Sequence, residues 1–147
     1  MSILKRYLRN EKGFTMIEMM VVLIIIAVLI AGGIKFYLGN IEKSKLSRAR
    51  MELYNMAAIL DAYYAETGQY PKDADEAIEM AGLPYEKVDD KKVLIKDPWG
   101  VNYSYTATED SNKKYTKYTL LAVDEGNNKK AYAIGENGKS DVGYGSP

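Results

Sequence analysis

The N-terminal part of the chain contains a long apolar run, and where this run begins depends on how one charged residue is treated. Residues 19–34, 16 positions, carry no charge and would span about 24 Å as a helix, short of a hydrocarbon core of roughly 30 Å. Starting at Phe14 gives 21 residues and about 31 Å, but then Glu18 lies inside the run. The pattern predicts a transmembrane helix over residues 14–34 that contains one carboxylate.

Helical periodicity continues beyond the apolar run as one amphipathic stripe. Its apolar positions recur at spacings of three and four residues: Leu46, Ala49, Leu53, Met56, Leu60 and Tyr63. No proline interrupts residues 14–66, and Gly68 followed by Pro71 is a strong stop signal. We therefore predict one helix over 14–66. Its second half should pack its stripe into a core, because barely three heptads are too few for a coiled-coil seam.

After residue 66 the spacing of apolar residues changes from a helical pattern to one that is partly typical of strands. Residues 71–84 predict a short helix closed by glycine and proline. Three segments rich in Tyr, Thr and Val, partly alternating, predict an antiparallel meander over 101–107, 115–123 and 130–134. A small sheet has one face to bury and the helical stripe offers the complementary surface, so an α+β fold is expected over residues 35–147.

Charge is balanced overall but not along the chain. The 20 basic and 20 acidic residues cancel, which gives no electrostatic reason to expect a direct nucleic-acid partner. Residues 1–13 sum to +3, and such a basic block before an apolar run favours a cytoplasmic N-terminus. The basic stretch 43–50 could suggest nucleic acid, but it lacks aromatic residues for stacking. A solvated or phospholipid-facing surface is the better interpretation.

Residue usage argues against catalysis. The chain has neither cysteine nor histidine, which removes disulfides, thiolate metal sites, the commonest general base and the usual nucleophile pairs. Neighbouring carboxylates such as Asp89 and Asp90 lie in a charged segment and are expected to be solvated. The chain is therefore not expected to be an enzyme.

Glu18 is the residue most in need of an explanation. A carboxylate in hydrocarbon costs roughly 2.5–3.5 kcal/mol on insertion scales, so an intramembrane Glu indicates a function or a partner. The alternative is a Glu that only marks the membrane boundary in the headgroup layer.

The segment "KGFTMIEMMVVLIIIAVLIAGG", residues 12–33, resembles the N-terminal signature of the type IV pilin superfamily. The resemblance implies that residues 1–13 are a leader, that a prepilin peptidase cleaves between Gly13 and Phe14, and that Phe14 is then N-methylated. It further implies a helical homopolymer with residues 14–34 in its core, in which the new amine of Phe14 approaches Glu18 of a neighbouring subunit. Each charge then neutralises the other.

A second resemblance narrows the family. "LDAYYAETGQYP" (60–71) and "KDPWGVNYSY" (96–105) are similar to the major pseudopilin of type II secretion systems. This implies a pilin fold, a role in protein export, and contacts with an inner-membrane assembly platform and minor pseudopilins. Trp99 is expected to be a core residue beside a structural turn. Two alternatives stay open: the major subunit of a type IV pilus for adhesion, twitching or DNA uptake, and a membrane-anchored module that never polymerises.

A calcium site is a further candidate. "AIGENGKSDVG", residues 133–143, resembles a shortened form of the calcium loop of secretion pseudopilins, which would use Ile134, Glu136, Asn137 and Asp141. Calcium prefers six to eight oxygen ligands. However, Asn137 stands where Asp is expected and several residues are missing. An Asn-Gly hairpin turn explains the same letters without metal, and "DEGNN" (124–128) is a rival site.

Overall fold

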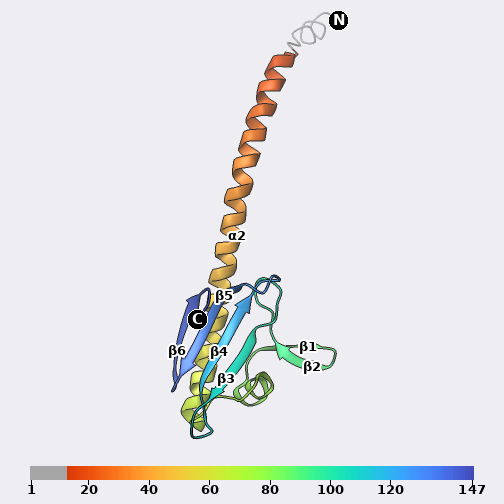
Figure 1. Cartoon of the computed structure of the whole chain (residues 1–147). Coiled ribbons are helices and arrows are strands. Elements are labelled where there is room, and N and C mark those ends of the chain that lie inside the picture. Colours follow the sequence, from red (N-terminus) through yellow and green to blue (C-terminus); the bar gives the residue numbers. More distant parts are fainter. Residues whose placement is uncertain (1–12) are drawn as a thin grey trace, which may run out of the picture. The chain divides into compact units, whose positions relative to one another are not determined.

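The computed structural model describes residues 13–147, and these divide between Ile41 and Glu42 into two compact units (Figure 1). Helix α2 (Met16–Thr67) contributes its first part to the first unit and residues 42–67 to the second. The prediction of one helix over 14–66 is confirmed to within two residues. Of the predicted leader, only Gly13 belongs to the described residues.

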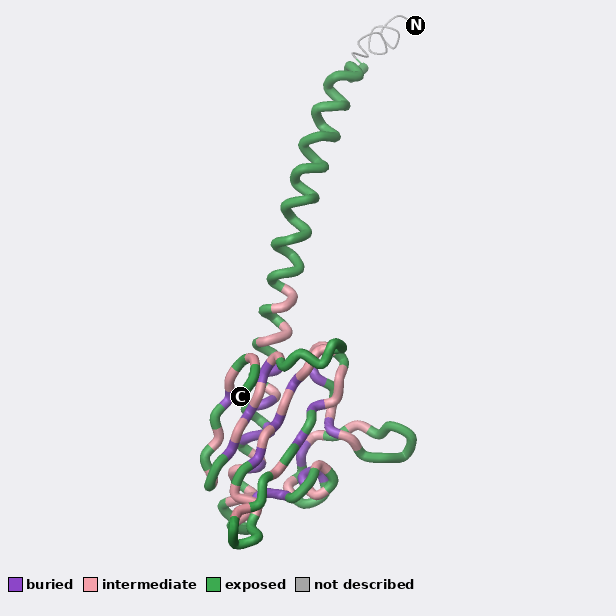
Figure 2. The backbone as a smooth tube through the Cα atoms, in the orientation of Figure 1, coloured by how far each residue is buried: buried purple, intermediate pink, exposed green. Residues whose placement is uncertain are grey.

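The first unit is a bare apolar helix. Every residue from 13 to 40 is exposed (Figure 2), including large apolar side chains along the whole run, such as Leu29 at 68%. Within the described residues, α2 is the helix whose length and composition suit a membrane span, and none of that stretch is buried. An exposed apolar surface this large needs lipid or like helices to cover it.

The second unit contains a four-stranded antiparallel sheet in the order β3 (Ser104–Glu109), β4 (Tyr115–Val123), β5 (Lys129–Glu136) and β6 (Lys139–Tyr144). The prediction for β4 is confirmed at both ends. The predicted strand at 101–107 is shifted to 104–109, because the amide of Asp97 donates to the carbonyl of Val101 at 2.7 Å and holds residues 97–101 in a turn. The prediction of three strands was wrong by one, since β6 returns along β5.

The helical stripe packs on this sheet, as predicted. Ala49, Leu53, Met56 and Leu60 are buried, while Leu46 and Tyr63 at its two ends are partly exposed. They share one hydrophobic core with inward-facing sheet residues that include Leu120, Ala122, Ala131 and Ala133.

The connection between helix and sheet differs from the prediction. The helix expected over 71–84 is confirmed only for α3 (Ala74–Glu76) and the π-helical turn η1 (Ala77–Ala81). The hairpin of β1 (Tyr85–Val88) and β2 (Lys91–Leu94) was not predicted, and it extends away from the four-stranded sheet (Figure 1). Its turn uses Asp89 and Asp90 at positive φ, where glycine or asparagine is the usual signal.

Candidate functional site

The predicted processing and assembly residues lie at the start of α2: Gly13 and Phe14 precede the helix, and Glu18 lies in its first turn. Thr15 is the residue before the helix, and its backbone N–H and hydroxyl donate to Oε2 of Glu18 at 3.0 and 3.1 Å. In return, the backbone N–H of Glu18 donates to Oγ1 of Thr15 at 3.2 Å. This reciprocal capping box satisfies two backbone donors that a helix start otherwise leaves unpaired. Phe14, directly before it, is 81% exposed.

The capping box gives Glu18 a partner within its own chain. Thr15 was missed in the sequence analysis, although its signal is local: a Thr three residues before a Glu at the start of an apolar helix. The structure thus joins Thr15 and Glu18 on the first turn, with Phe14 directly before them in the chain. A second group can bind the carboxylate only by competing with Thr15 or by using the second oxygen, for which no contact is seen among the described residues.

A buried carboxylate organises the turn before the sheet. Asp97 is 4% exposed, and its Oδ1 accepts from the backbone N–H groups of Trp99 and Val101 at 2.9 and 3.1 Å. Its Oδ2 accepts from the backbone N–H of Val123 on β4 at 2.9 Å. The sequence analysis singled out Trp99 but not this aspartate. The signal was an Asp directly before Pro-Trp-Gly, a common beginning of a turn.

Trp99 lies at the edge of the core rather than inside it. The side chain is partly buried, and its indole N–H donates to Oε2 of Glu42 at 3.1 Å. Nζ of Lys130 lies 5.9 Å from the ring centroid and 3.2 Å from Oε1 of Glu42. The prediction of a core tryptophan is therefore confirmed only in part: the ring packs against the core, but its polar edge forms a hydrogen bond at the surface.

Asp124 completes this group, which we call the junction cluster: Glu42, Trp99, Asp124 and Lys130. Oδ2 of Asp124 lies 3.3 Å from Nζ of Lys130. Hydrogen bonds from the side chain and backbone of Asn128, aided by Lys130, lower the pKa of Asp124 to about 2. The indole N–H of Trp99, and then Lys130, lower the pKa of Glu42 against a smaller opposing effect of burial. Both carboxylates are thereby held ionised.

The residues of the predicted calcium site lie on the hairpin of β5 and β6. Ile134 and Asp141 are directly opposite each other, and Asn137 with Gly138 forms a turn with both residues at positive φ. The carboxylate of Glu136 is 2.7 Å from Nζ of Lys117. Among residues 13–147, no three acidic or other strong ligand side chains converge. The donor set does not fit a calcium ion well in this arrangement, which favours the hairpin-turn alternative.

Side-chain hydrogen bonds attach the same hairpin to α2 without an ion. Oδ1 of Asp61 accepts from Ser140 at 2.7 Å and from the hydroxyl of Tyr70 at 3.0 Å. The hydroxyl of Tyr118 lies 2.6 Å from Oγ of Ser140, and the backbone N–H of Gly138 donates to Tyr70 at 3.0 Å. Burial raises the pKa of Tyr70 and of Tyr118, so both remain neutral donors.

Comparison with known proteins agrees with this architecture. Residues 8–34 match the family model of the prokaryotic N-terminal methylation motif, and residues 36–137 match the model of type II secretion system protein G. The type II secretion system core protein G of Vibrio cholerae is 32% identical over 111 residues, which cover 70% of this chain and 75% of that protein. The corresponding proteins of Escherichia coli and Pseudomonas aeruginosa are each 33% identical, over 64% and 67% of this chain and 70% and 75% of their own lengths.

An apolar N-terminal helix that carries a methylation motif and continues into a small antiparallel sheet defines a pilin-like structural protein rather than an enzyme. Within that class, the chain belongs to the protein G family of type II secretion systems, the major pseudopilins. Of the alternatives that the sequence left open, the secretion-system pseudopilin is therefore the one supported.

Proposed function

We propose that the chain is made as a membrane-inserted precursor, cleaved between Gly13 and Phe14, methylated on Phe14, and then assembled into a helical homopolymer. The methylation motif over residues 8–34 and the exposure of Phe14 support this route. Residues 14–34 span the inner membrane with the N-terminus in the cytoplasm, and residues 35–147 lie on the other side. In the filament, residues 14–34 pack against like helices instead of lipid.

The observation that carries this proposal is the position of Glu18 on the first helical turn. Cleavage creates a positive amine at Phe14, four residues before the carboxylate. In a stack of parallel helices the amine of one subunit reaches Glu18 of its neighbour, where it competes with the capping contacts from Thr15. Removing one partner of a buried ion pair costs about 3–5 kcal/mol, enough to make assembly depend on correct register.

Two substitutions separate the charge of Glu18 from its capping role. Glu18→Ala removes both, whereas Glu18→Gln keeps an oxygen acceptor for Thr15 and loses only the charge. We expect both variants to be processed and neither to form filaments. Glu66→Ala, which removes an exposed carboxylate near the other end of α2, should assemble normally. Filament assembly at the normal rate by Glu18→Gln would refute the ion-pair proposal.

Intact-mass spectrometry tests the processing step by itself. The mass of membrane-extracted protein should correspond to a chain that begins at Phe14 and carries one extra methyl group. Assembled material that still contains residues 1–13 would contradict the proposed cleavage. Because this measurement does not depend on assembly, it separates a processing failure from an assembly failure.

The proposed partners follow from this route. They are further copies of the chain, a prepilin peptidase, an inner-membrane assembly platform with minor pseudopilins, and membrane lipid before assembly. Deleting the gene should abolish export of secreted proteins. Normal export with loss of surface fibres would instead support a pilus subunit.

Calcium binding by Ile134, Glu136, Asn137 and Asp141 stays a prediction, and the contacts of the β5–β6 hairpin indicate how removal of calcium should affect stability. The contacts of Asp61 with Ser140 and Tyr70 attach the hairpin to α2 without an ion. We therefore expect chelation to leave the melting temperature unchanged. A rise in melting temperature with added calcium, lost in Asp141→Asn, would establish the site.

A further inference from the structure

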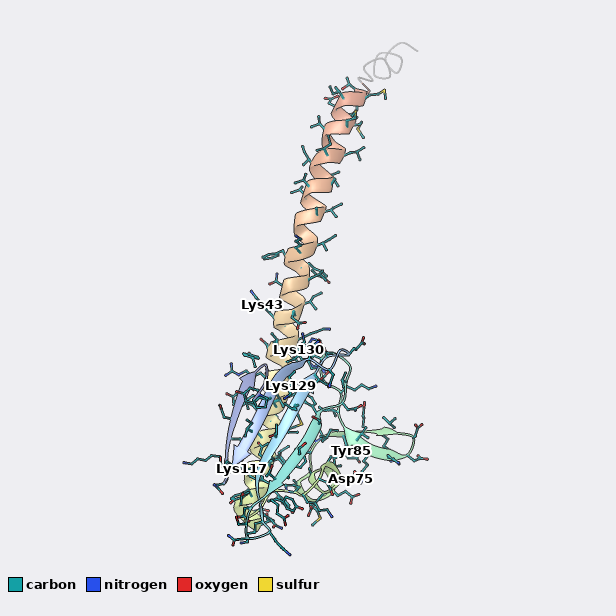
Figure 3. All side chains as sticks on the ribbon, in the orientation of Figure 1. Lys43, Asp75, Tyr85, Lys117, Lys129 and Lys130 are labelled. Atoms are coloured by element: carbon teal, nitrogen blue, oxygen red, sulfur yellow. The ribbon has the colours of Figure 1, made fainter. Side chains whose placement is uncertain are left out.

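Three lysines gather at the end of the second unit where α2 enters it. We call Lys43, Lys45 and Lys129 the junction lysines. Figure 3 shows Lys43 and Lys129 at this end together with Lys130, and Lys117 at the opposite end of the sheet. The ion pair of Lys130 with Glu42 fixes the start of β5 against this part of α2, so the neighbouring Lys129 is held there as well.

The junction lysines outnumber the acidic groups around them that Lys130 leaves uncompensated. Glu42 and Asp124 both lie within 3.3 Å of Lys130, so one ammonium group is shared by two carboxylates and one negative charge remains. Among the described residues, no ion pair joins a junction lysine to a carboxylate; Lys129 donates instead to the hydroxyl of Ser146 at 3.3 Å. Glu125 is the other exposed acid of the adjoining loop. Counting Lys130, the four lysines at this end face three acidic residues, Glu42, Asp124 and Glu125, so their net charge is 4 − 3 = +1.

The short length of chain after the proposed span limits how far this end of the unit can lie from the membrane surface. The proposed span ends at Ile34, and Lys43 follows nine positions later, about 14 Å along a helix. The headgroup layer extends roughly 5–8 Å beyond the hydrocarbon, so the remaining distance is about one Debye length, and the lysine side chain shortens it further. Phe36 and Tyr37, both exposed, follow the span after Lys35, where aromatic side chains favour the interface.

We propose that the junction lysines form a docking surface for anionic phospholipid headgroups, which holds the second unit on the membrane before assembly. This inference rests on the proposed membrane insertion of residues 14–34. Nucleic acid is a poorer match for the surface. The nearby Trp99 has its indole N–H bonded to Glu42 and Lys130 near its ring, so its face is not free to stack on a base. Extraction into a filament would have to break this lipid contact.

The single tryptophan is a reporter for the docking. Trp99 and Lys45 line the same surface hollow. We would place the full chain in nanodiscs that contain phosphatidylcholine with a headgroup-linked nitroxide, with or without phosphatidylglycerol, and measure quenching of Trp99. The test variant replaces all three junction lysines with Gln. The matched control replaces Lys87, Lys91 and Lys114, exposed lysines on the β1–β2 hairpin and beside β4.

We expect phosphatidylglycerol to increase quenching at low salt, and high salt to reverse the increase. Each neutralised junction lysine should lower the ratio of docked to undocked protein by up to about fivefold, and the control triple variant should behave as the wild type. Equal quenching in both lipids would overturn the inference, as would an effect that depends on a single-stranded oligonucleotide and not on lipid. A chain that fails to enter the nanodiscs would count instead against the proposed membrane span.

Discussion

Asp97→Ala should be among the most destabilising single changes in the second unit. The carboxylate is 4% exposed and accepts three backbone N–H groups, from Trp99, Val101 and Val123. A hydrogen bond to a charged group contributes about 1.5–3 kcal/mol, and a buried donor left unpaired costs about 1–3 kcal/mol. The contributions do not add fully, because water can reach part of the turn. We expect the free energy of unfolding to fall by about 3–5 kcal/mol.

Asp97→Asn separates the two carboxylate oxygens. An amide retains one oxygen for Trp99 and Val101 but presents an NH₂ group to the N–H of Val123. We therefore expect an intermediate loss of about 1–3 kcal/mol. Asp75→Ala, at an exposed acid of α3, is the control and should stay within about 0.5 kcal/mol of the wild type.

Urea unfolding of the full chain in nanodiscs, followed by far-ultraviolet circular dichroism and by tryptophan fluorescence, measures these differences. Coincident transitions would show that the second unit unfolds cooperatively. If Asp97→Ala stays within about 0.5 kcal/mol of the wild type, the reasoning from buried unpaired donors is refuted.

Two further predictions concern packing and pH. A methyl group at Gly135 would overlap the ring of Tyr118, which is buried and hydrogen-bonded through its hydroxyl. Gly135→Ala should therefore lower the free energy of unfolding of the second unit by about 1–3 kcal/mol. Gly39→Ala, where the added methyl group meets open space, is the control and should not destabilise the second unit. The pKa values of Glu42 and Asp124 are lowered on folding, so their stabilisation is present above the unfolded pKa and is lost as the pH falls through the lowered values, about 2 for Asp124. Tryptophan fluorescence should report this acid transition, and Asp124→Asn should reduce its amplitude; an unchanged amplitude would contradict the assignment.

The sequence by itself determined the elements whose signals are local. The helix over 16–67 follows from the apolar run and the stripe, and β4 follows from a partly alternating segment rich in Tyr, Thr and Val. The sequence also contains the signal for the capping contacts between Thr15 and Glu18, because helix geometry places residues three apart within hydrogen-bonding distance. The N-terminal motif that identifies the family is likewise a contiguous stretch.

Only the tertiary structure decided which distant residues meet. Strand β6 has a weak local signal, since it contains Gly143 and two charged residues, and it forms because the Asn137–Gly138 turn brings it alongside β5. Glu42 and Lys130 lie 88 positions apart in the sequence, yet share the junction cluster. Periodicity reveals which face of an element is apolar, but the partner of a polar group depends on the path of the whole chain, because many pairings satisfy the same pattern.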